Sequence, residues 1–503
     1  MEITPIGFLF LIIIVSILYN RKKLFENLFL LCLVTQLFVD IGFVAKIGET
    51  YIKYTGLIEF VLIIYCVLKI KKIDKRNNRK WRFLIFSYFV SILLLIVYPS
   101  SVFVTPPGTH WDYFYSGEIG LVHPRFNMGV VTMTIKFVLY SMIVLYAYSV
   151  CALKDYVRIL SKMSKIINVF IILGIVEFFF KNFGGGNELW GNMLKIMFGI
   201  RDESMVAYYG RMRGGLYELN LFTTEASHYA YILFLVILLK FAYNIAINKK
   251  KKLDFPIIVS VVIALLSTSF SALLFLAGFA ALYLVYRWGI IKPKSRKIEQ
   301  IVFIGLIIVF SSSALISITK QAETEGAILF RLTNLFNNWD DYMAIDQQID
   351  FHGEDPSSQV RLFSVLQSLN AFASRPLFGH SLSIISCHGA ATMFLADVGI
   401  VGLILWIRFY FYGCPLVYDL LINKRAYIMG ILIYILLNLT NSINLRPFYE
   451  LTSIAYVICC CFIFSMDKLD KKKLSNSCSK VDVIKEIDEK NSILSERDST
   501  HKW

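Results

Sequence analysis

The stretch "KKIDKRNNRKWRFLIFSYFVSILLLIVYPS", residues 71–100, changes within a few positions from strongly basic to apolar. Its first part is the most basic loop of the chain, and residues 83–98 carry no charge. A segment needs about 20 apolar residues to cross a hydrocarbon core of about 30 Å. In lipid it must satisfy its own backbone groups, so such a segment folds as a helix. The stretch therefore predicts a transmembrane helix with its basic flank in the cytoplasm.

The same alternation recurs along all 503 residues, of which 57% are hydrophobic and only 17% charged. Soluble domains average about 25% charged residues. The composition predicts an all-α polytopic membrane protein, with about 13 transmembrane helices within residues 1–466. We expect spans near 4–20, 25–46, 54–70, 83–98, 130–152, 166–181 and 223–247, a hairpin of two turning at "STSFSA" (267–272), then 299–318, 398–421 and two more.

The basic clusters set the expected orientation. The first apolar run has no basic flank before it and Arg21-Lys22-Lys23 after it, which is opposite to a cleaved signal peptide. We therefore expect a first span with the N-terminus outside, and a charged, disordered cytoplasmic tail over 467–503. The loops 99–128 and 182–222 and a long segment, 319–397, then lie outside. The net charge of +15 follows from the positive-inside pattern, so no nucleic-acid partner is expected.

Charged residues inside predicted spans are few. Asp40, Glu59, Lys136 and Glu177 are the candidates, and they form no chain of acids across the membrane. A charge in the bilayer centre costs at least about 2.5–3.5 kcal/mol. We expect these side chains to reach the interface or to pair between helices.

The outer loops carry the groups that suit chemistry on an anion. "YYGRMRGGLYELNLFTTEASHYA" (208–230) holds Arg211, Arg213 and Glu225, and the long segment holds Arg361 and His388. Arginine on an outer face departs from the positive-inside tendency, and guanidinium groups bind phosphate oxygens in pairs. A lipid-linked diphosphate at the membrane surface fits this location. The alternative is pairing with loop acids, which are Asp340, Asp341, Asp350, Glu354 and Asp355.

Histidine supplies a base near neutral pH. His388 precedes an expected helix, whose N-terminal dipole disfavours the imidazolium and so keeps the ring neutral. The alternative is a structural hydrogen bond. The pair Cys387-His388 lacks a second ligand pair at zinc spacing, so no metal site is expected. Cys387 is also the only cysteine in an expected outer loop, so no disulfide framework is expected there.

The segment "RLFSVLQSLNAFASRPLFGHSLSIISCHGAATMFLADVGIVGLILWI" (361–407) resembles the signature of the O-antigen polymerase and O-antigen ligase superfamily of bacterial surface-polysaccharide assembly. In that pattern an Arg opens a helix, Pro-Leu-Phe-Gly and a His follow, and a short helix ends Gly-x-x-Gly before a span. Arg361, 376–379, His388 and 399–402 fill these places. Upstream, Arg211 and Arg213 precede Gly-Gly, and Glu225-Ala226-Ser227 stands where Glu-Pro-Ser is common. Phe270 replaces an Arg of the family pattern, and the Pro after Glu225 is missing.

The resemblance implies a glycosyltransferase of GT-C-like architecture in the bacterial inner membrane. Such an enzyme polymerises undecaprenyl-diphosphate-linked oligosaccharides into O-antigen or capsular polysaccharide and needs no metal or other cofactor. It implies that Arg211, Arg213 and Arg361 bind the diphosphate and that His388, or Glu225, is the base. Membrane lipid, a flippase and a chain-length regulator are the implied partners. The alternatives are the ligase of the same superfamily, which transfers glycan to lipid A-core, a lipid-linked oligosaccharide transporter, and a structural scaffold.

Overall fold

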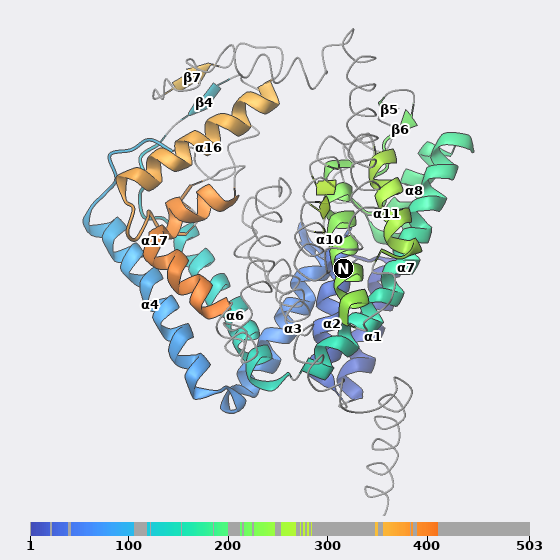
Figure 1. Cartoon of the computed structure of the whole chain (residues 1–503), viewed down its shortest axis with the longest axis horizontal. Coiled ribbons are helices and arrows are strands. Elements are labelled where there is room, and N and C mark those ends of the chain that lie inside the picture. Colours follow the sequence, from blue (N-terminus) through green and yellow to red (C-terminus); the bar gives the residue numbers. More distant parts are fainter. Residues whose placement is uncertain are drawn as a thin grey trace, which may run out of the picture.

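The computed structural model describes residues 2–20, 23–38, 42–104, 118–120, 122–151, 153–184, 186–199, 212–213, 216–223, 226–246, 253–267, 348–350 and 356–410 without 383 and 386–389, with single positions between 272 and 283. This part is mostly helical (Figure 1). Its helices are α1 (Pro5–Tyr19), α2 (Leu24–Thr35), α3 (Tyr54–Leu68), α4 (Lys75–Val97), α6 (Met128–Val150), α7 (Leu153–Phe183), α8 (Asn187–Phe198), α10 (Ala226–Ala246), α11 (Phe255–Leu266), α16 (Pro356–Ser374) and α17 (Ala390–Tyr410), with short 3-10 turns η1 (Gln36–Phe38) and η2 (Ile70–Lys72).

Three of these helices are long and apolar enough to cross a membrane: Asn77–Val97, Met128–Val150 and Arg158–Phe183. Shorter apolar helices cover six more of the expected spans. The expected spans up to residue 266 and the described part of the span at 398–421 overlap helices, although their bounds differ in places. The expected span after the 267–272 turn is described only at scattered positions, and those at 299–318 and beyond 421 lie outside the described residues. The sequence therefore predicts the helices well where the structure describes them.

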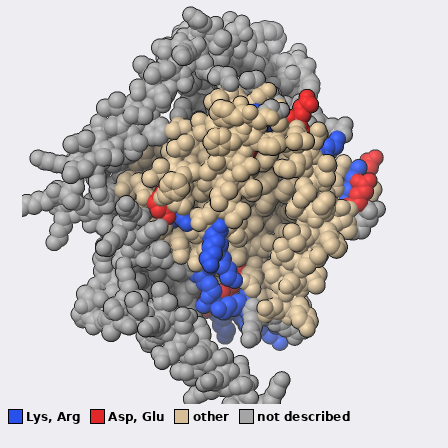
Figure 2. All heavy atoms as spheres, turned by 90° about the vertical axis from the view of Figure 1, so that its right-hand side faces the viewer, with Lys and Arg blue, Asp and Glu red and all other residues tan. Residues whose placement is uncertain are grey.

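The outer surface of the helices is apolar. On α4, Phe86, Phe89 and Leu93 are each more than half exposed, and on α7 the same holds for Ile172 and Phe179. Figure 2 shows a broad area with few charged side chains on the α7, α8 and α11 side, with Lys and Arg gathered along its lower edge. Soluble monomers rarely expose continuous apolar surface of this kind, whereas hydrocarbon chains cover it at no cost.

Local sequence signals fix where several helices begin. Asp74 ends the basic turn and its carboxylate accepts a hydrogen bond from the backbone N–H of Asn77, so α4 starts at Lys75. Asn127 caps α6 in the same way through Val130, and Asp254 caps α11. Such side-chain acceptors satisfy N–H groups that the first turn of a helix leaves unpaired.

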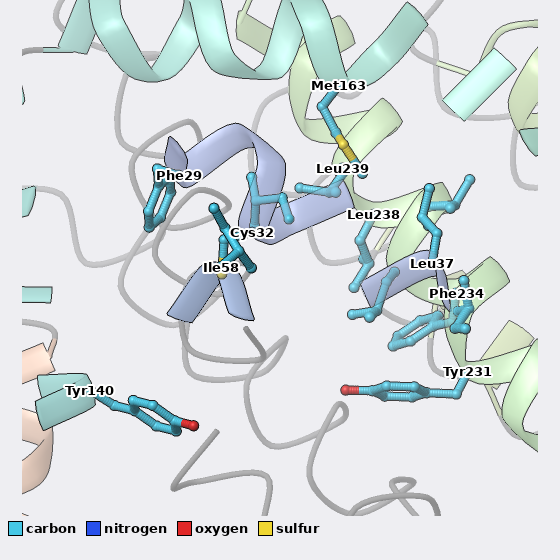
Figure 3. Close-up of a cluster of buried hydrophobic side chains, with 14 of the residues drawn as sticks. Phe29, Cys32, Leu37, Ile58, Tyr140, Met163, Tyr231, Phe234, Leu238 and Leu239 are labelled. Atoms are coloured by element: carbon cyan, nitrogen blue, oxygen red, sulfur yellow. The ribbon is translucent and has the colours of Figure 1, made fainter. Parts of the chain in front are cut away.

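The core forms around α2, which lies between α3 on one side and α7 and α10 on the other. Cys32 of α2, Ile58 of α3 and Met163 of α7 are fully buried (Figure 3). Leu238 and Leu239 of α10 belong to the same cluster. This packing joins segments from the first and the middle parts of the chain into one bundle.

Three small sheets accompany the helices of this mostly helical fold. One joins β1 (Glu2–Ile3), β2 (Ala45–Ile47) and β3 (Thr50–Ile52), all antiparallel. The others are the pair β4 (Glu118–Gly120) with β7 (Gln348–Asp350), and the hairpin β5 (Met212–Arg213) with β6 (Leu216–Tyr217). They lie before α1 and in the connections between helices, where backbone groups still need partners.

The expected span 25–46 is accordingly wrong at its C-terminal end. Helix α2 stops at Thr35, and after η1 the backbone of Gly42 adopts a positive φ of 73°. The next N–H groups then bond elsewhere: Phe43 donates to the carbonyl of Phe198 and Val44 to that of Ile52. The sequence after α2 stays apolar because residues 43–45 of this loop are buried, and the apolar run therefore looked like a continuation of the helix.

The connections fall into two groups by their contacts. The N-terminus, the 43–52 hairpin and the end of α8 contact one another through β1–β2 pairing and the Phe43–Phe198 bond. At the other end of the helices, Asp74 donates its N–H to the Ser149 hydroxyl, and Arg158 pairs with Glu26 at 2.8 Å. This grouping agrees with the alternation that the basic clusters predict.

Candidate functional site

The structure places two of the five candidate residues on described elements. Arg213 lies in β5, and Arg361 lies in α16. Figure 1 shows both elements at the end of the bundle opposite η2, with the hairpin on the side of α8 and α10 and α16 on the side of α4. Arg211, Glu225 and His388 lie outside the described residues. The described contacts do not join the hairpin to α16 directly.

The last turns of α7 hold the hairpin in place. The Asn182 side-chain oxygen accepts the backbone N–H of Tyr217 at 2.9 Å. The ammonium group of the preceding residue, Lys181, donates to the carbonyl of Glu218 at 3.0 Å. The strand that pairs with Arg213's strand is therefore attached to α7 by two side chains of that helix.

Glu177, a further turn down α7, is the centre of this attachment. Its carboxylate pairs with Lys181 at 2.8 Å, and both side chains are fully buried. It also accepts the backbone N–H groups of Asn220 at 3.2 Å and of Leu221 at 2.9 and 3.0 Å. Glu177 was expected to reach the interface or to pair between helices, and it instead pairs within its own helix and holds a loop. An acid and a lysine four residues apart in an apolar run are the sequence signal that could have shown this.

The second candidate region is the connection between α16 and α17. Helix α17 is broken at Gly399, whose φ of 67° and ψ of −174° are not helical. An unbroken helix would bond Ile400 and Val401 back to Ala396 and Asp397. Here they bond to the loop: Ile400 donates to Pro376 at 2.8 Å and Val401 to Leu377 at 3.0 Å.

The loop also satisfies the carbonyl groups that the break leaves open. The backbone N–H of His380 donates to the carbonyl of Ala396 at 2.9 Å, and the backbone N–H of Ser381 donates to the carbonyl of Asp397 at 2.7 Å. The Pro-Leu-Phe-Gly segment and the broken helix thus exchange four backbone bonds. Irregular backbone at a membrane helix is tolerated only where protein satisfies it in this way. The short helix before a Gly-x-x-Gly step, which the family resemblance implies, corresponds to the part of α17 before Gly399.

Two glycines allow this close contact. A Cβ on Gly379 would lie 2.5 Å from the Asp397 backbone, and a Cβ on Gly399 would lie 2.4 Å from the Leu377 backbone. Both also have positive φ values, of 65° and 67°. Only glycine meets both requirements without strain.

His380 is completely buried beside this contact. Its Nε2 lies 2.9 Å from the Ala371 carbonyl and 3.0 Å from the Ser374 hydroxyl, so Nε2 carries the hydrogen. Burial lowers the pKa of His380 to about 4, the bond to Ala371 opposes this, and the Arg375 charge lowers it further. The ring is therefore neutral at pH 7. Sequence reasoning singled out His388 for chemistry and gave His380 no role, and only the tertiary contacts show that His380 supports the loop.

Arg375 lies in the expected outer segment 319–397, where arginine is expected to bind an anion. One arm of its guanidinium, Nη2, instead donates to the carbonyl of Tyr98 at the C-terminal end of α4. A cation there also meets the negative end of the helix dipole. Burial lowers the pKa of Arg375, but arginine keeps its charge in proteins. Its Nη1 has no hydrogen-bond partner within the part of the chain that the structure describes.

No group of three His, Cys, Asp or Glu side chains that could hold a metal ion occurs among the described residues. Comparison with known proteins gives no match, whether with family models, with curated proteins or with solved structures. The family resemblance therefore rests on the motifs of the sequence.

Proposed function

We propose that this protein is a membrane glycosyltransferase that polymerises undecaprenyl-diphosphate-linked repeat units at the outer face of the bacterial cytoplasmic membrane. Two features of the sequence support this proposal: the motifs within residues 205–410, and the presence of arginine and histidine in segments that the basic clusters predict to lie outside. In this proposal the chain crosses the membrane about 13 times, with its N-terminus outside and its C-terminus in the cytoplasm.

The observation that carries the proposal is the anchoring of two arginine-bearing elements at one end of the bundle. β5, with Arg213, belongs to a hairpin fixed to the end of α7, and α16, with Arg361, leads into the loop locked to α17. A diphosphate that leaves a sugar gathers negative charge, and cations already held in position stabilise that charge best. Fixed backbone on both elements is what such preorganisation needs.

The roles proposed for the side chains follow from their chemistry. Arg211, Arg213 and Arg361 bind the diphosphate of the donor lipid. His388, or Glu225, takes the proton from the acceptor hydroxyl as its oxygen attacks the anomeric carbon. The bond from that carbon to the diphosphate oxygen breaks, and the lipid diphosphate leaves with the electron pair. No metal or nucleotide sugar takes part in this scheme.

A transporter predicts ionisable groups near the middle of the membrane that are open to both faces. Among the described residues, Glu59 instead accepts a hydrogen bond from Tyr140 at 2.5 Å, and Glu177 is paired with Lys181. Both groups are thus used in packing, which favours the enzyme over the transporter.

A deletion strain tests the proposal. Gel separation of its surface glycans should show single-repeat caps on lipid A-core in place of long chains, and the intact gene should restore the ladder. Complete absence of capped lipid A-core would identify the ligase instead. An unchanged ladder would refute both enzymes.

A further inference from the structure

The Glu177–Lys181 pair is more than a means of burying two charges. Replacing a buried ion pair with apolar side chains is often neutral or stabilising, so the pair by itself is weak evidence of a stability role. What sets it apart is that three of its described contacts reach the backbone of one short segment, residues 218–221. The pair is therefore arranged around this loop.

The loop needs such support because its backbone is strained. Leu221 has a φ of 45°, in the left-handed region that residues with a Cβ seldom occupy. Such conformations persist where surrounding contacts impose them, and they are concentrated at functional sites. The Glu177 carboxylate accepts the N–H of Leu221 with both oxygens, which holds this residue in its unusual conformation.

The helix that carries Glu177 also fixes the segment after the loop. Tyr229 of α10 is fully buried, and its hydroxyl group packs against Gly174 of α7. A Cβ atom at position 174 would lie only 2.3 Å from this hydroxyl oxygen. Helices α7 and α10 therefore touch closely one turn below Glu177. The chain from β6 to the start of α10 is held at both ends by α7, with Leu221 between them.

We propose that Glu177 and Lys181 are positioning residues for donor binding: they hold the 218–221 loop, and through it the β5–β6 hairpin that carries Arg213. This inference rests on the proposed function, in which Arg213 binds the donor diphosphate. Neither Glu177 nor Lys181 touches substrate in this scheme. They act by fixing the backbone from which the reacting groups project.

Two double variants separate positioning from charge burial. E177Q/K181M removes both charges but keeps a side-chain oxygen that can accept the loop N–H groups, whereas E177L/K181M removes both charges and the acceptor. E26Q/R158M, which removes another ion pair of α7 far from the loop, is the control. All are reconstituted as full-length protein in lipid, and activity is normalised to inserted protein.

The first measurement is amide hydrogen exchange of residues 218–223. We expect exchange at least about tenfold faster in E177L/K181M than in E177Q/K181M, because the loop has lost its acceptor. The second is the KM for an undecaprenyl-diphosphate-linked repeat unit, which should rise about tenfold or more between the same two variants, with a smaller change in kcat. The control should match the wild type in both.

Equal exchange in the two variants would overturn the positioning role, whatever the activity. Faster exchange with an unchanged KM would overturn it too, because the loop would then not serve donor binding. Absence of glycan transfer by the wild type would refute the proposed function itself and is seen before any variant is made. If E177L/K181M does not insert, Asn182→Ala removes the milder anchor at Tyr217, and it should shift exchange and KM in the same direction by a smaller factor.

Discussion

The backbone N–H of Ile400 donates to the carbonyl oxygen of Pro376 over 2.8 Å, in place of the bond it would make within an unbroken helix. A loop that precedes α17 in the chain thus completes α17 at its break. This contact lies between the part of α17 before Gly399 and the part that begins at Ile400.

Gly399→Ala should destabilise the protein. The φ and ψ of Gly399 lie in a region that is essentially restricted to glycine, which costs an alanine of order 1–3 kcal/mol, and its Cβ would also collide with the Leu377 backbone. Thermal unfolding in detergent measures the loss. Gly56→Ala is the control: nothing lies near its Cβ inside α3, so it should be neutral or slightly stabilising. Equal stability of both variants would contradict the role given to the break.

His380 should make stability depend on pH. Its pKa in the folded protein is about 4, below the ordinary 6.5, so the unfolded chain binds the proton more readily between these values. Its contribution is therefore complete above pH 6.5 and is lost as the pH falls toward 4. His380→Gln keeps a donor for Ala371 and cannot titrate, so its melting temperature should fall less between pH 7 and pH 4.5. A wild-type slope in His380→Gln would refute the argument.

Removing one partner of the buried pair should cost more than removing both charges. Lys181→Met leaves the Glu177 carboxylate buried without its cation, which typically costs about 3–5 kcal/mol. E177Q/K181M leaves no buried charge and should lie much closer to the wild type. Denaturation of the purified proteins gives the free energy of unfolding of each variant. If Lys181→Met were as stable as E177Q/K181M, the Glu177 carboxylate would be solvated rather than buried.

Arg361→Ala and His388→Ala should each abolish long glycan chains while the protein remains inserted. Arg361→Lys should also be poor, because an ammonium group cannot reproduce the planar guanidinium fork. Glycan ladders from a complemented deletion strain report the outcome. Arg82→Ala, at an exposed position of α4, should leave the ladder intact. Normal ladders from Arg361→Ala and His388→Ala would remove the site assignment.

The orientation can be tested with single cysteines in a background that lacks the native ones. Glu49→Cys, in the turn between β2 and β3, should react with a membrane-impermeant maleimide in intact cells, and Lys72→Cys, in η2, should react only after lysis. Both positions are exposed, so access to the reagent decides the result. The opposite pattern would invert the topology.

The candidate site could be predicted only in part. The motifs pointed to the hairpin region before α10 and the Pro-Leu-Phe-Gly loop before α17, and both segments have specific tertiary contacts. The partners of individual groups were not predictable. Arg375 bonds to Tyr98, which is 277 positions away, and Glu177 bonds to Leu221, 44 positions away. Sequence spacing does not encode such contacts, so Arg375 was expected to pair with an anion and Glu177 with another helix or the interface.

The sequence by itself determined the helices, because hydropathy and capping are local: an apolar run in lipid has one way to satisfy its backbone, and Asp74 or Asn127 marks where it starts. Only the tertiary structure decided where the helices stop or break. After Gly42 and after Gly399, the backbone N–H groups bond to carbonyl groups of other segments instead of continuing a helix, and those segments become neighbours only once the bundle has formed.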